Sequence, residues 1–201
     1  MGWFKRKSQG IFTESKDKKD VPEGLWYKCP QCKQLSTKED HAKNNWVCSY
    51  CDYHTRINSK QYFSILFDNN KYVEINQNVK SLDPLSFEDK KKYTNRLLEA
   101  EKKTDFKEAI STAYGKINNN MIAIAVMNFE FIGGSISSAV GEKICRIIKV
   151  SIKKKMPLVI ISKSGGARMM EAAFSLMQLA KTSSYLSLLS KEKIPYISLL
   201  T

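Results

Sequence analysis

The sequence predicts an α/β protein with a small cysteine-rich module in front of its main domain. From residue 121 onward, apolar segments of strand length alternate with long helical segments, and four of the five cysteines fall within residues 25–58. Strands that alternate with helices form a sheet with helices packed on it, and continuously apolar strands indicate burial on both faces. With 201 residues, of which 42% are hydrophobic, the chain can bury one substantial core and a small additional module.

The chain carries a formal net charge of +13. Such a charge favours an anionic partner, which could be nucleic acid, a lipid head group or a phosphorylated ligand. No segment approaches the roughly 18 consecutive apolar residues of a membrane-spanning helix. The first residues also lack the apolar segment of a signal peptide. We therefore expect a cytoplasmic protein without a membrane span, whose thiols are reduced.

The first part of the chain is mixed in pattern. Residues 1–24 are charged and poor in apolar side chains, and we expect a flexible basic tail there. After the module at 25–58, the main domain takes up 59–201. Its first segments predict a helix or strand at 60–67, a helix at 86–104 with Ser86 as its N-cap, and another short helix at 105–117 that Gly115 closes.

The alternation that predicts the fold class begins at residue 121. Strands are expected at 121–131, 157–162 and 194–200. One helix should follow a glycine turn and end near residue 156, and another should run from Ala167 to residue 189. The apolar side chains of the first of these helices recur at helical spacing, at Val140, Ile144, Ile147, Ile148 and Ile152. Cys145 lies within this stripe and is expected to be a buried, unreactive thiol.

Four cysteines are spaced as in a structural zinc site. Cys29 and Cys32 form one C-x2-C pair, Cys48 and Cys51 form the other, and 15 residues separate the pairs. Four thiolates around one zinc ion leave no position for water, so the site is expected to be structural rather than catalytic. Two disulfides or an iron–sulfur cluster are the alternatives, and a reducing compartment disfavours the disulfides.

The other side chains of the module allow two interpretations. His41 and His54 are expected at the surface or beside the metal, because four cysteines already fill its coordination shell. The aromatic residues of the module stand among lysines and could bind nucleic acid by stacking on bases. In so small a module the same aromatic residues could instead form the core.

Two glycine pairs each follow an expected strand and precede an expected helix. Gly165 and Gly166 follow one strand, and Gly133 and Gly134 follow the other. Glycine permits close backbone approach, and the unpaired amides of a helix N-terminus favour a phosphate or an oxyanion. The glycines could equally serve only to make tight turns. Neither loop has the spacing of a nucleotide-binding motif.

Residues 59–201 contain no histidine, and their one cysteine lies in a helical stripe. A nucleophile activated by histidine therefore cannot be assembled from this domain. An enzyme built on it would have to work largely through backbone amides, with the substrate or a cofactor supplying the acid–base groups.

The motifs together resemble a known family. "PEGLWYKCPQC" with "CSYC", "GGSISSAVGEKICR", "SGGARMMEAAFSLMQLAKTS" and "IPYISLLT" are similar to the carboxyltransferase beta subunits of bacterial multi-subunit acetyl-CoA carboxylase. The resemblance implies a crotonase-like fold with an N-terminal zinc ribbon. It also implies transfer of a carboxyl group from carboxybiotin to acetyl-CoA, which gives malonyl-CoA for fatty acid synthesis.

The resemblance also implies partners and residue roles. The partners would be a carboxyltransferase alpha subunit, in an α2β2 heterotetramer, the biotin carboxyl carrier protein and biotin carboxylase. Gly165 and Gly166 would supply oxyanion or CoA-facing amides, with Ala167 beside them. A second loop at Gly133, Gly134 and Ser135 would contact CoA. Arg168 would meet a CoA phosphate or a neighbouring subunit.

Three features depart from the family pattern. Relatives often have glycine in place of Ser137 and glutamine in place of Met170. The family also continues past "ISLLT" with a further glycine loop and helices, so we expect this chain to be inactive alone. Three other hypotheses remain: a zinc-ribbon protein that binds nucleic acid, an assembly subunit without an active site, and a biotin-dependent decarboxylase subunit.

Overall fold

The computed structural model describes residues 25–201, and the predicted basic tail at 1–24 lies outside the described residues. The chain divides into two compact units between Arg56 and Ile57, two residues before the boundary expected from the sequence. The first unit is the cysteine-rich module and the second is the α/β domain.

The cysteine-rich module is built from a short hairpin and one helical turn and a half. Strands β1 (Trp26–Lys28) and β2 (Leu35–Thr37) pair in antiparallel fashion, and α1 (Lys38–Lys43) follows directly. Thr37 is the N-cap of α1, because its hydroxyl accepts the backbone N–H of Asp40.

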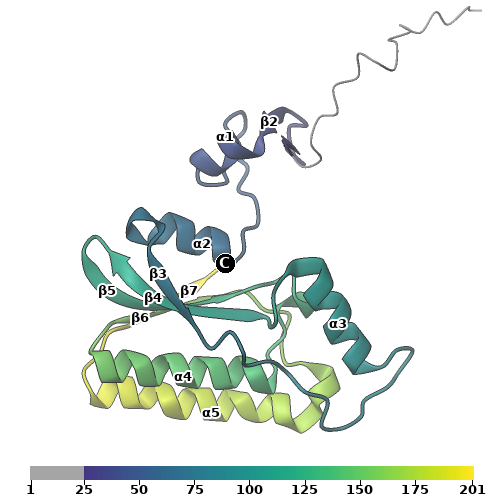
Figure 1. The fold of residues 1–201 in the computed structure, drawn as a ribbon, viewed down its shortest axis with the longest axis vertical. Coiled ribbons are helices and arrows are strands. Elements are labelled where there is room, and N and C mark those ends of the chain that lie inside the picture. Colours follow the sequence, from purple (N-terminus) through teal and green to yellow (C-terminus); the bar gives the residue numbers. More distant parts are fainter. Residues whose placement is uncertain (1–24) are drawn as a thin grey trace, which may run out of the picture. The chain divides into compact units, whose positions relative to one another are not determined.

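The α/β domain contains one mixed five-stranded sheet in the order β3-β4-β5-β6-β7 (Figure 1). Strand β4 pairs in antiparallel fashion with both β3 and β5, and β5, β6 and β7 are parallel. Their bounds are β3 (Tyr72–Ile75), β4 (Ile110–Ile117), β5 (Asn120–Met127), β6 (Leu158–Ser162) and β7 (Tyr196–Leu200). The mixed α/β class predicted from the sequence is confirmed.

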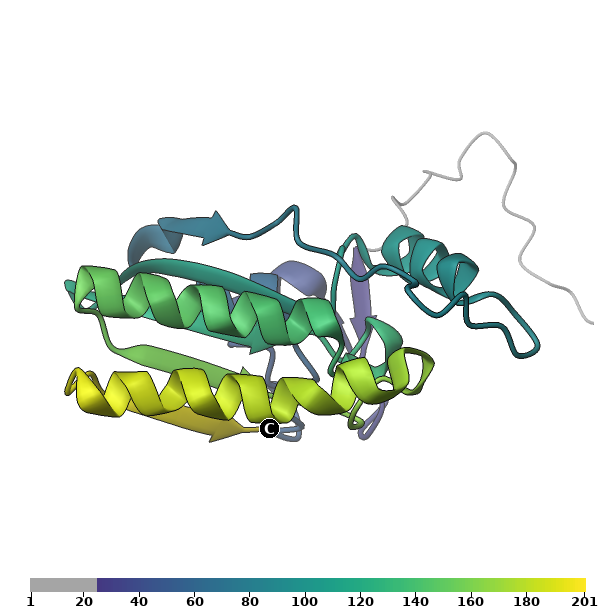
Figure 2. The ribbon, with the colours of Figure 1, turned by 90° about the horizontal axis from the view of Figure 1, so that it is seen from below.

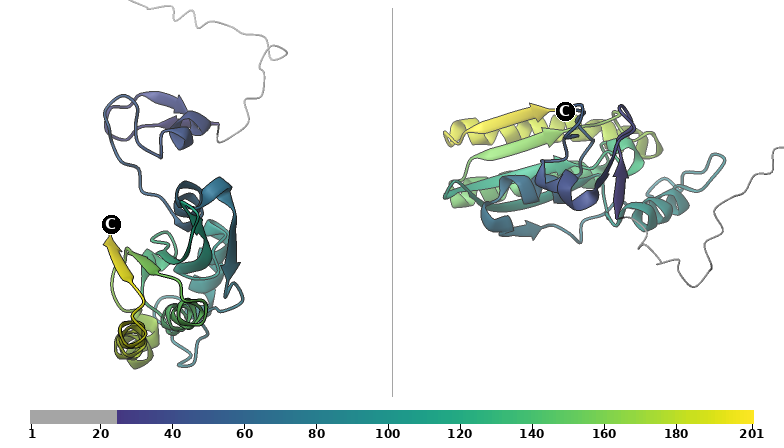
Figure 3. Two further views of the ribbon diagram at one scale, coloured as in Figure 1. Left: turned by 90° about the vertical axis from the view of Figure 1, so that its left-hand side faces the viewer. Right: turned by 90° about the horizontal axis from the view of Figure 1, so that it is seen from above.

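Helices cover both faces of this sheet. The long helices α4 (Ser138–Lys154) and α5 (Ala172–Lys191) lie side by side on one face, as Figure 2 shows, and are seen nearly end-on in the left view of Figure 3. Helix α2 (Ser59–Leu66) packs on the other face, against β4 and β5. Helix α3 (Tyr93–Thr104) lies at one end of the domain (Figure 1).

The core has two layers, one on each face of the sheet. Between the sheet and the long helices lie apolar side chains that include three members of the predicted stripe, Val140, Ile147 and Ile148. Cys145 of the same helix is buried, and burial raises the pKa of its thiol, as expected of an unreactive cysteine. The smaller layer packs α2 against the other face, and its buried members are Phe63, Phe67, Ala113, Ile124, Val126 and Ile161.

Two of the expected elements are wrong. Residues 105–117 do not form a helix closed by Gly115, because strand β4 runs through Gly115. A side chain there is excluded, since a Cβ would lie 2.7 Å from the Phe67 ring and 2.8 Å from the Lys71 carbonyl oxygen. Ser86 does not cap α3, which begins seven residues later at Tyr93.

The remaining short helical turns are η1 (Asp68–Asn70), η2 (Ile132–Gly134) and η3 (Met169–Glu171). Across residues 25–201, every helix is too short or too polar to cross a membrane.

Ser137 provides a test of how the N-terminus of α4 is capped. Its buried hydroxyl accepts the Val140 N–H at 3.0 Å, so it caps the helix. Ser137→Ala should lower the free energy of unfolding by about 1 kcal/mol, whereas Ser137→Gly should cost only a few tenths, since glycine is also a tolerated N-cap. Urea unfolding followed by circular dichroism measures both. Equal losses in the two variants would contradict the capping role.

Candidate active site and metal centre

The two cysteine pairs lie in turns that share one backbone geometry. The Cys29 carbonyl accepts the Lys33 N–H at 3.0 Å, and the Cys48 carbonyl accepts the Asp52 N–H at 2.9 Å. Lys33 and Asp52 both have positive φ, 63° and 55°. Each turn therefore brings the two thiols of its pair to one side, as a metal-binding knuckle requires.

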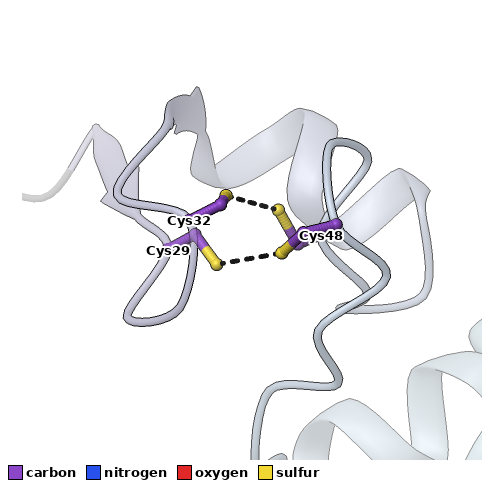
Figure 4. Close-up of side chains that lie close together, drawn as sticks. Cys29, Cys32 and Cys48 are labelled. Carbon is purple, nitrogen blue, oxygen red and sulfur yellow. Dashed lines mark hydrogen bonds between the residues drawn. The ribbon is translucent and has the colours of Figure 1, made fainter.

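The four thiols meet in one cluster (Figure 4). The sulfur atoms of Cys29 and Cys51 are 3.7 Å apart, as are those of Cys32 and Cys48, and all four lie within 4.8 Å of one another. A tetrahedral zinc ion with Zn–S bonds of about 2.3 Å has S–S edges of about 3.8 Å. The cluster fits such an ion, and the four cysteines are free rather than joined in disulfides.

Two thiols of this cluster have pKa values shifted in opposite directions, and burial raises the pKa of the Cys51 thiol to about 12. Burial acts to raise the pKa of the Cys29 thiol, but the backbone amides of Cys32 and Gln31 outweigh it and lower the pKa to about 6. The thiolate is the form of cysteine that binds metal ions. The backbone amides of this turn therefore favour the metal-binding form of Cys29.

The sequence suggested that His41 lies at the surface or beside the metal, and the structure excludes the first of these positions. The His41 ring is buried, stacks on Tyr27 at 3.9 Å between centroids and meets Trp46 edge-on at 5.6 Å. Its Nε2 forms a 2.9 Å hydrogen bond with the Thr55 hydroxyl, and burial lowers its pKa. The histidine is thus part of the core of the module.

The two glycine loops leave the sheet at the same edge. The first loop (residues 131–137) follows β5 and the second (residues 163–171) follows β6. Since β5 and β6 are parallel neighbours in register from Ala123 and Leu158, their carboxyl ends meet at one edge. Ligands of open α/β sheets bind at such edges.

Backbone hydrogen bonds join the two loops. The Gly165 N–H donates to the Gly133 carbonyl at 2.9 Å. The Ile136 N–H donates to the Gly166 carbonyl at 2.8 Å, and the Arg168 N–H donates to the Ile136 carbonyl at 2.8 Å. These last two bonds form a one-residue parallel bridge, so the loops form a single unit.

Gly134 is required where the loops approach most closely. It has a φ of 63°, and a Cβ there would lie 2.3 Å from the carbonyl oxygen of Lys163. Gly133 has a similar φ of 62° but has open space around it. A side chain at Gly134 would therefore push the second loop away.

The glycines of the second loop differ in what their amides do. The Gly165 N–H is taken by the first loop, whereas the Gly166 N–H donates only to the hydroxyl of exposed Ser164, at 3.0 Å. Gly166 has a φ of 115° and is exposed, as is Ala167. Because Ala167 is the bridge residue opposite Ile136, its own N–H points away from the first loop.

The expectation that a helix begins at Ala167 is wrong. Residues Met169–Glu171 form the turn η3, and α5 begins only at Ala172. The amides of the glycine pair are therefore not those of a helix N-terminus, and any anion they bind is held by the loop itself.

The structure also corrects the expectation for Arg168. Its side chain is fully buried, so it cannot reach a CoA phosphate or a neighbouring subunit. Each of its five N–H groups has an acceptor within the domain. Nε donates to Ser135 Oγ (2.9 Å), Nη1 to Ser81 Oγ and Tyr93 Oη (both 3.1 Å), and Nη2 to Glu108 Oε1 (2.6 Å) and the Ser135 carbonyl (3.1 Å).

Glu171 extends this buried network to α4. It accepts the Tyr93 hydroxyl at 2.7 Å and the Ser138 N–H at 2.6 Å, at the start of that helix. Burial acts to raise the pKa of Glu171, but these hydrogen bonds outweigh it and lower the pKa. Its contribution to stability is therefore present at neutral pH and is lost as the pH falls below the ordinary carboxyl value of 4.5.

Sequence reasoning missed four members of this network, Ser81, Tyr93, Glu108 and Glu171. The spacing of Arg168 and Glu171 is typical of a helical pair and was visible. Glu108 lies 60 residues from Arg168 and carries no local signal.

Comparison with known proteins gives a consistent result. Residues 67–201 match the carboxyl transferase domain family. The acetyl-coenzyme A carboxylase carboxyl transferase subunit beta of Pedobacter heparinus is 58% identical over all 201 residues, which cover 72% of that protein. The subunit of the same name from Flavobacterium psychrophilum is 56% identical, again over the whole chain and 70% of the relative.

Solved structures share the fold at low identity. Transcarboxylase 12S with methylmalonyl-coenzyme A bound superposes with a TM-score of 0.59 at 20% identity, over 73% of this chain and 26% of that one. The MdcD–MdcE hetero-dimer of Pseudomonas malonate decarboxylase gives 0.52 at 16% identity, over 72% of this chain and 52% of that one. The chain thus spans about a quarter and about half of these two proteins, and their likeness concerns the fold alone.

The two glycines of the first loop offer a matched pair of variants. Gly133→Ala and Gly134→Ala both place alanine at a φ near 60°, which costs roughly 1–2 kcal/mol. Only the second also brings a Cβ against the Lys163 carbonyl, so it should lower the free energy of unfolding by clearly more. Urea unfolding curves compare the two. A loss at Gly134 no larger than at Gly133 would contradict the close approach of the loops.

Proposed function

The chain belongs to the carboxyl transferase family, among the beta subunits of acetyl-coenzyme A carboxylase, and from this premise we propose that it transfers a carboxyl group from carboxybiotin to acetyl-CoA. The product would be malonyl-CoA, for fatty acid synthesis. The observation that carries the proposal is the joined pair of glycine loops at the carboxyl edge of β5 and β6, in a domain without histidine.

The chemistry suits a site made of backbone amides. Carboxybiotin supplies carbon dioxide, and the ureido nitrogen it leaves accepts the methyl proton of acetyl-CoA. Loss of that proton leaves an enolate whose negative charge lies on the thioester oxygen, and its methyl carbon then forms the new bond to carbon dioxide. The task of this chain is to hold N–H donors against that oxygen, which preorganised amides do well in a site that excludes water.

Within the second loop, Gly165 and Gly166 would have different roles. The Gly165 N–H is needed to join the loops, so Gly165 positions the site. The Gly166 N–H is held only by a side-chain hydroxyl, which can rotate away when a stronger acceptor arrives. Gly166 is therefore the proposed oxyanion donor, with exposed Ala167 beside the substrate.

The first loop would contact CoA through its backbone. Gly133 is accessible and has open space around it, whereas Gly134 is buried against the second loop. The Ser135 hydroxyl accepts from Arg168 and so faces inward. The contact with CoA therefore falls mainly to Gly133, and Gly134 and Ser135 support it.

The partners follow from the subunit character of the relatives. The alpha subunit, in an α2β2 heterotetramer, is the proposed partner, with the biotin carboxyl carrier protein and biotin carboxylase providing the carboxyl donor in the cytoplasm. Helix α5 supports an interface because large apolar side chains on it are exposed, namely Phe174, Leu176, Met177 and Leu179. The net charge of +13 suits the phosphates of CoA.

We assign zinc to the four-cysteine cluster, in a structural role. The spacing of the two pairs, the S–S separations and the closed set of soft ligands all match a tetrahedral zinc site. No step of the carboxyl transfer runs through this ion, since four protein ligands leave no open position.

One observation also supports nucleic-acid binding by the module as a secondary property. Trp26 and Tyr50 are 55% and 63% exposed, so these two rings do not form its core. Exposed aromatic rings in a basic protein can stack on unpaired bases.

The oxyanion assignment predicts different effects at two neighbouring residues. Gly166→Ala should lower kcat about 10²-fold, because alanine disfavours a φ of 115° and displaces the amide. Ser164→Ala should keep most of the activity, since it removes the competing acceptor of the Gly166 N–H and one long hydrogen bond, at 3.3 Å, to the Gly166 carbonyl. The assay follows carboxyl transfer from malonyl-CoA to biocytin with the alpha subunit added. Full activity of Gly166→Ala would contradict the donor role.

The zinc assignment predicts metal loss in one cysteine variant and not in another. Cys48→Ser should lose the ion, since a hydroxyl replaces one of four thiolates, and the module should unfold with it. Cys145→Ala is the control, because that thiol lies in α4 outside the cluster. Mass spectrometry of the purified proteins should find one zinc per chain in the control. Unchanged zinc content in Cys48→Ser would contradict the assignment.

A further inference from the structure

We infer that Arg168 is a positioning residue whose buried guanidinium keeps the two glycine loops, and with them the amide of Gly166, in place. The inference rests on the proposed function for its effect on catalysis. Its structural part can be measured in the chain itself.

Arg168 has no N–H donor left for a ligand. Its five N–H groups have five acceptors within the domain, and its side chain is fully buried. Burial alone would lower the pKa of Arg168, but the Glu108 carboxylate outweighs it and raises the pKa, so the group stays charged. An arginine in this state acts on the rest of the protein only.

Arg168 binds the first loop through both its main chain and its side chain. Three of its hydrogen bonds reach the first loop: the backbone N–H to the Ile136 carbonyl, Nε to Ser135 Oγ and Nη2 to the Ser135 carbonyl. Arg168 itself belongs to the second loop. One residue therefore ties the loops together through both its main chain and its side chain.

Arg168 also connects the two joined loops to the rest of the domain. The other donors of Arg168 reach Glu108, just before β4, Tyr93 of α3, and Ser81. Glu108 is itself held by the N–H groups of Ser81 and Ala109. The loops are thus fixed against segments that lie 60 to 87 residues earlier in the chain.

The planar fork of arginine is needed for this arrangement. Lysine would keep the positive charge beside Glu108 but offers three donors from a single atom, and it cannot bond Ser135 and Glu108 in parallel. Arg168→Lys should therefore preserve the ion pair and the fold, yet release the first loop. The double variant Arg168→Met/Glu108→Gln removes both charges of the closest ion pair together. Buried Glu171, 3.9 Å from the guanidinium, then keeps only its hydrogen bonds from Tyr93 and Ser138.

Amide hydrogen exchange tests the inference without any assay of activity. In both variants the Gly165 and Ile136 amides should exchange at least about tenfold faster, since the bonds that join the loops open more often. The amide of Ala125, within β5, should exchange as in the unaltered protein. Arg146→Met is the matched control, because it breaks an exposed ion pair on α4 with Glu142 and should leave both rates unchanged.

Catalysis provides the second readout. With the alpha subunit and carboxybiotin donor, both variants should lose about 10²-fold in kcat with little change in KM, as expected when a reacting group is misplaced by about 1 Å. Unchanged exchange at Gly165 and Ile136 would overturn the inference, as would an equal rise at Ala125, which would mean that Arg168 only stabilises the fold. Absence of activity in the unaltered protein would instead count against the proposed function, and the exchange rates would still decide the inference.

Discussion

The parallel pairing of β5 with β6 is the constraint on which the candidate site depends. Both strands are buried and end at the same edge of the sheet, so the loops that follow them must leave side by side. Gly134 then allows those loops to approach within hydrogen-bonding distance, because it places no Cβ against the Lys163 carbonyl. Once they meet, the Gly165 N–H is used for the junction, and the neighbouring amide of Gly166 remains accessible at the surface.

The buried charge network beside the glycine loops is tolerated because its charged groups are paired with one another and with hydrogen-bonding partners. Removing a guanidinium and carboxylates from water is costly, and the cost is offset only when every donor and acceptor is paired. Arg168 meets this condition with five acceptors, and Glu171 meets part of it by accepting the Ser138 N–H, where a negative charge also suits the start of α4. The same pairing that makes the network tolerable also makes it specific, since a shifted loop would leave a buried group unpaired.

The sequence predicted those features that depend on local pattern. The strands β5, β6 and β7, the helix α4 and the four-cysteine cluster all follow from periodicity or spacing within short segments. The errors arose where contacts with residues distant in the sequence determine the local structure. Residues 110–117 form a strand because β3 and β5 pair with them on both sides, and Gly115 fits there because Phe67 occupies the space of a side chain.

Arg168 shows most clearly why the site could be predicted only in part. A cation beside two glycines indicates an anion ligand as long as the side chain is taken to be exposed. Its acceptors at Ser81, Tyr93 and Glu108 come from segments whose proximity only the folded chain reveals, and they turn the side chain inward. The donors of this positive charge are therefore all used within the domain, and in the proposed function the negative charge of a substrate would meet the backbone amides of the loops instead. In a domain without histidine, backbone amides can stabilise charge on a carbonyl oxygen when the loops that carry them are held in a fixed arrangement.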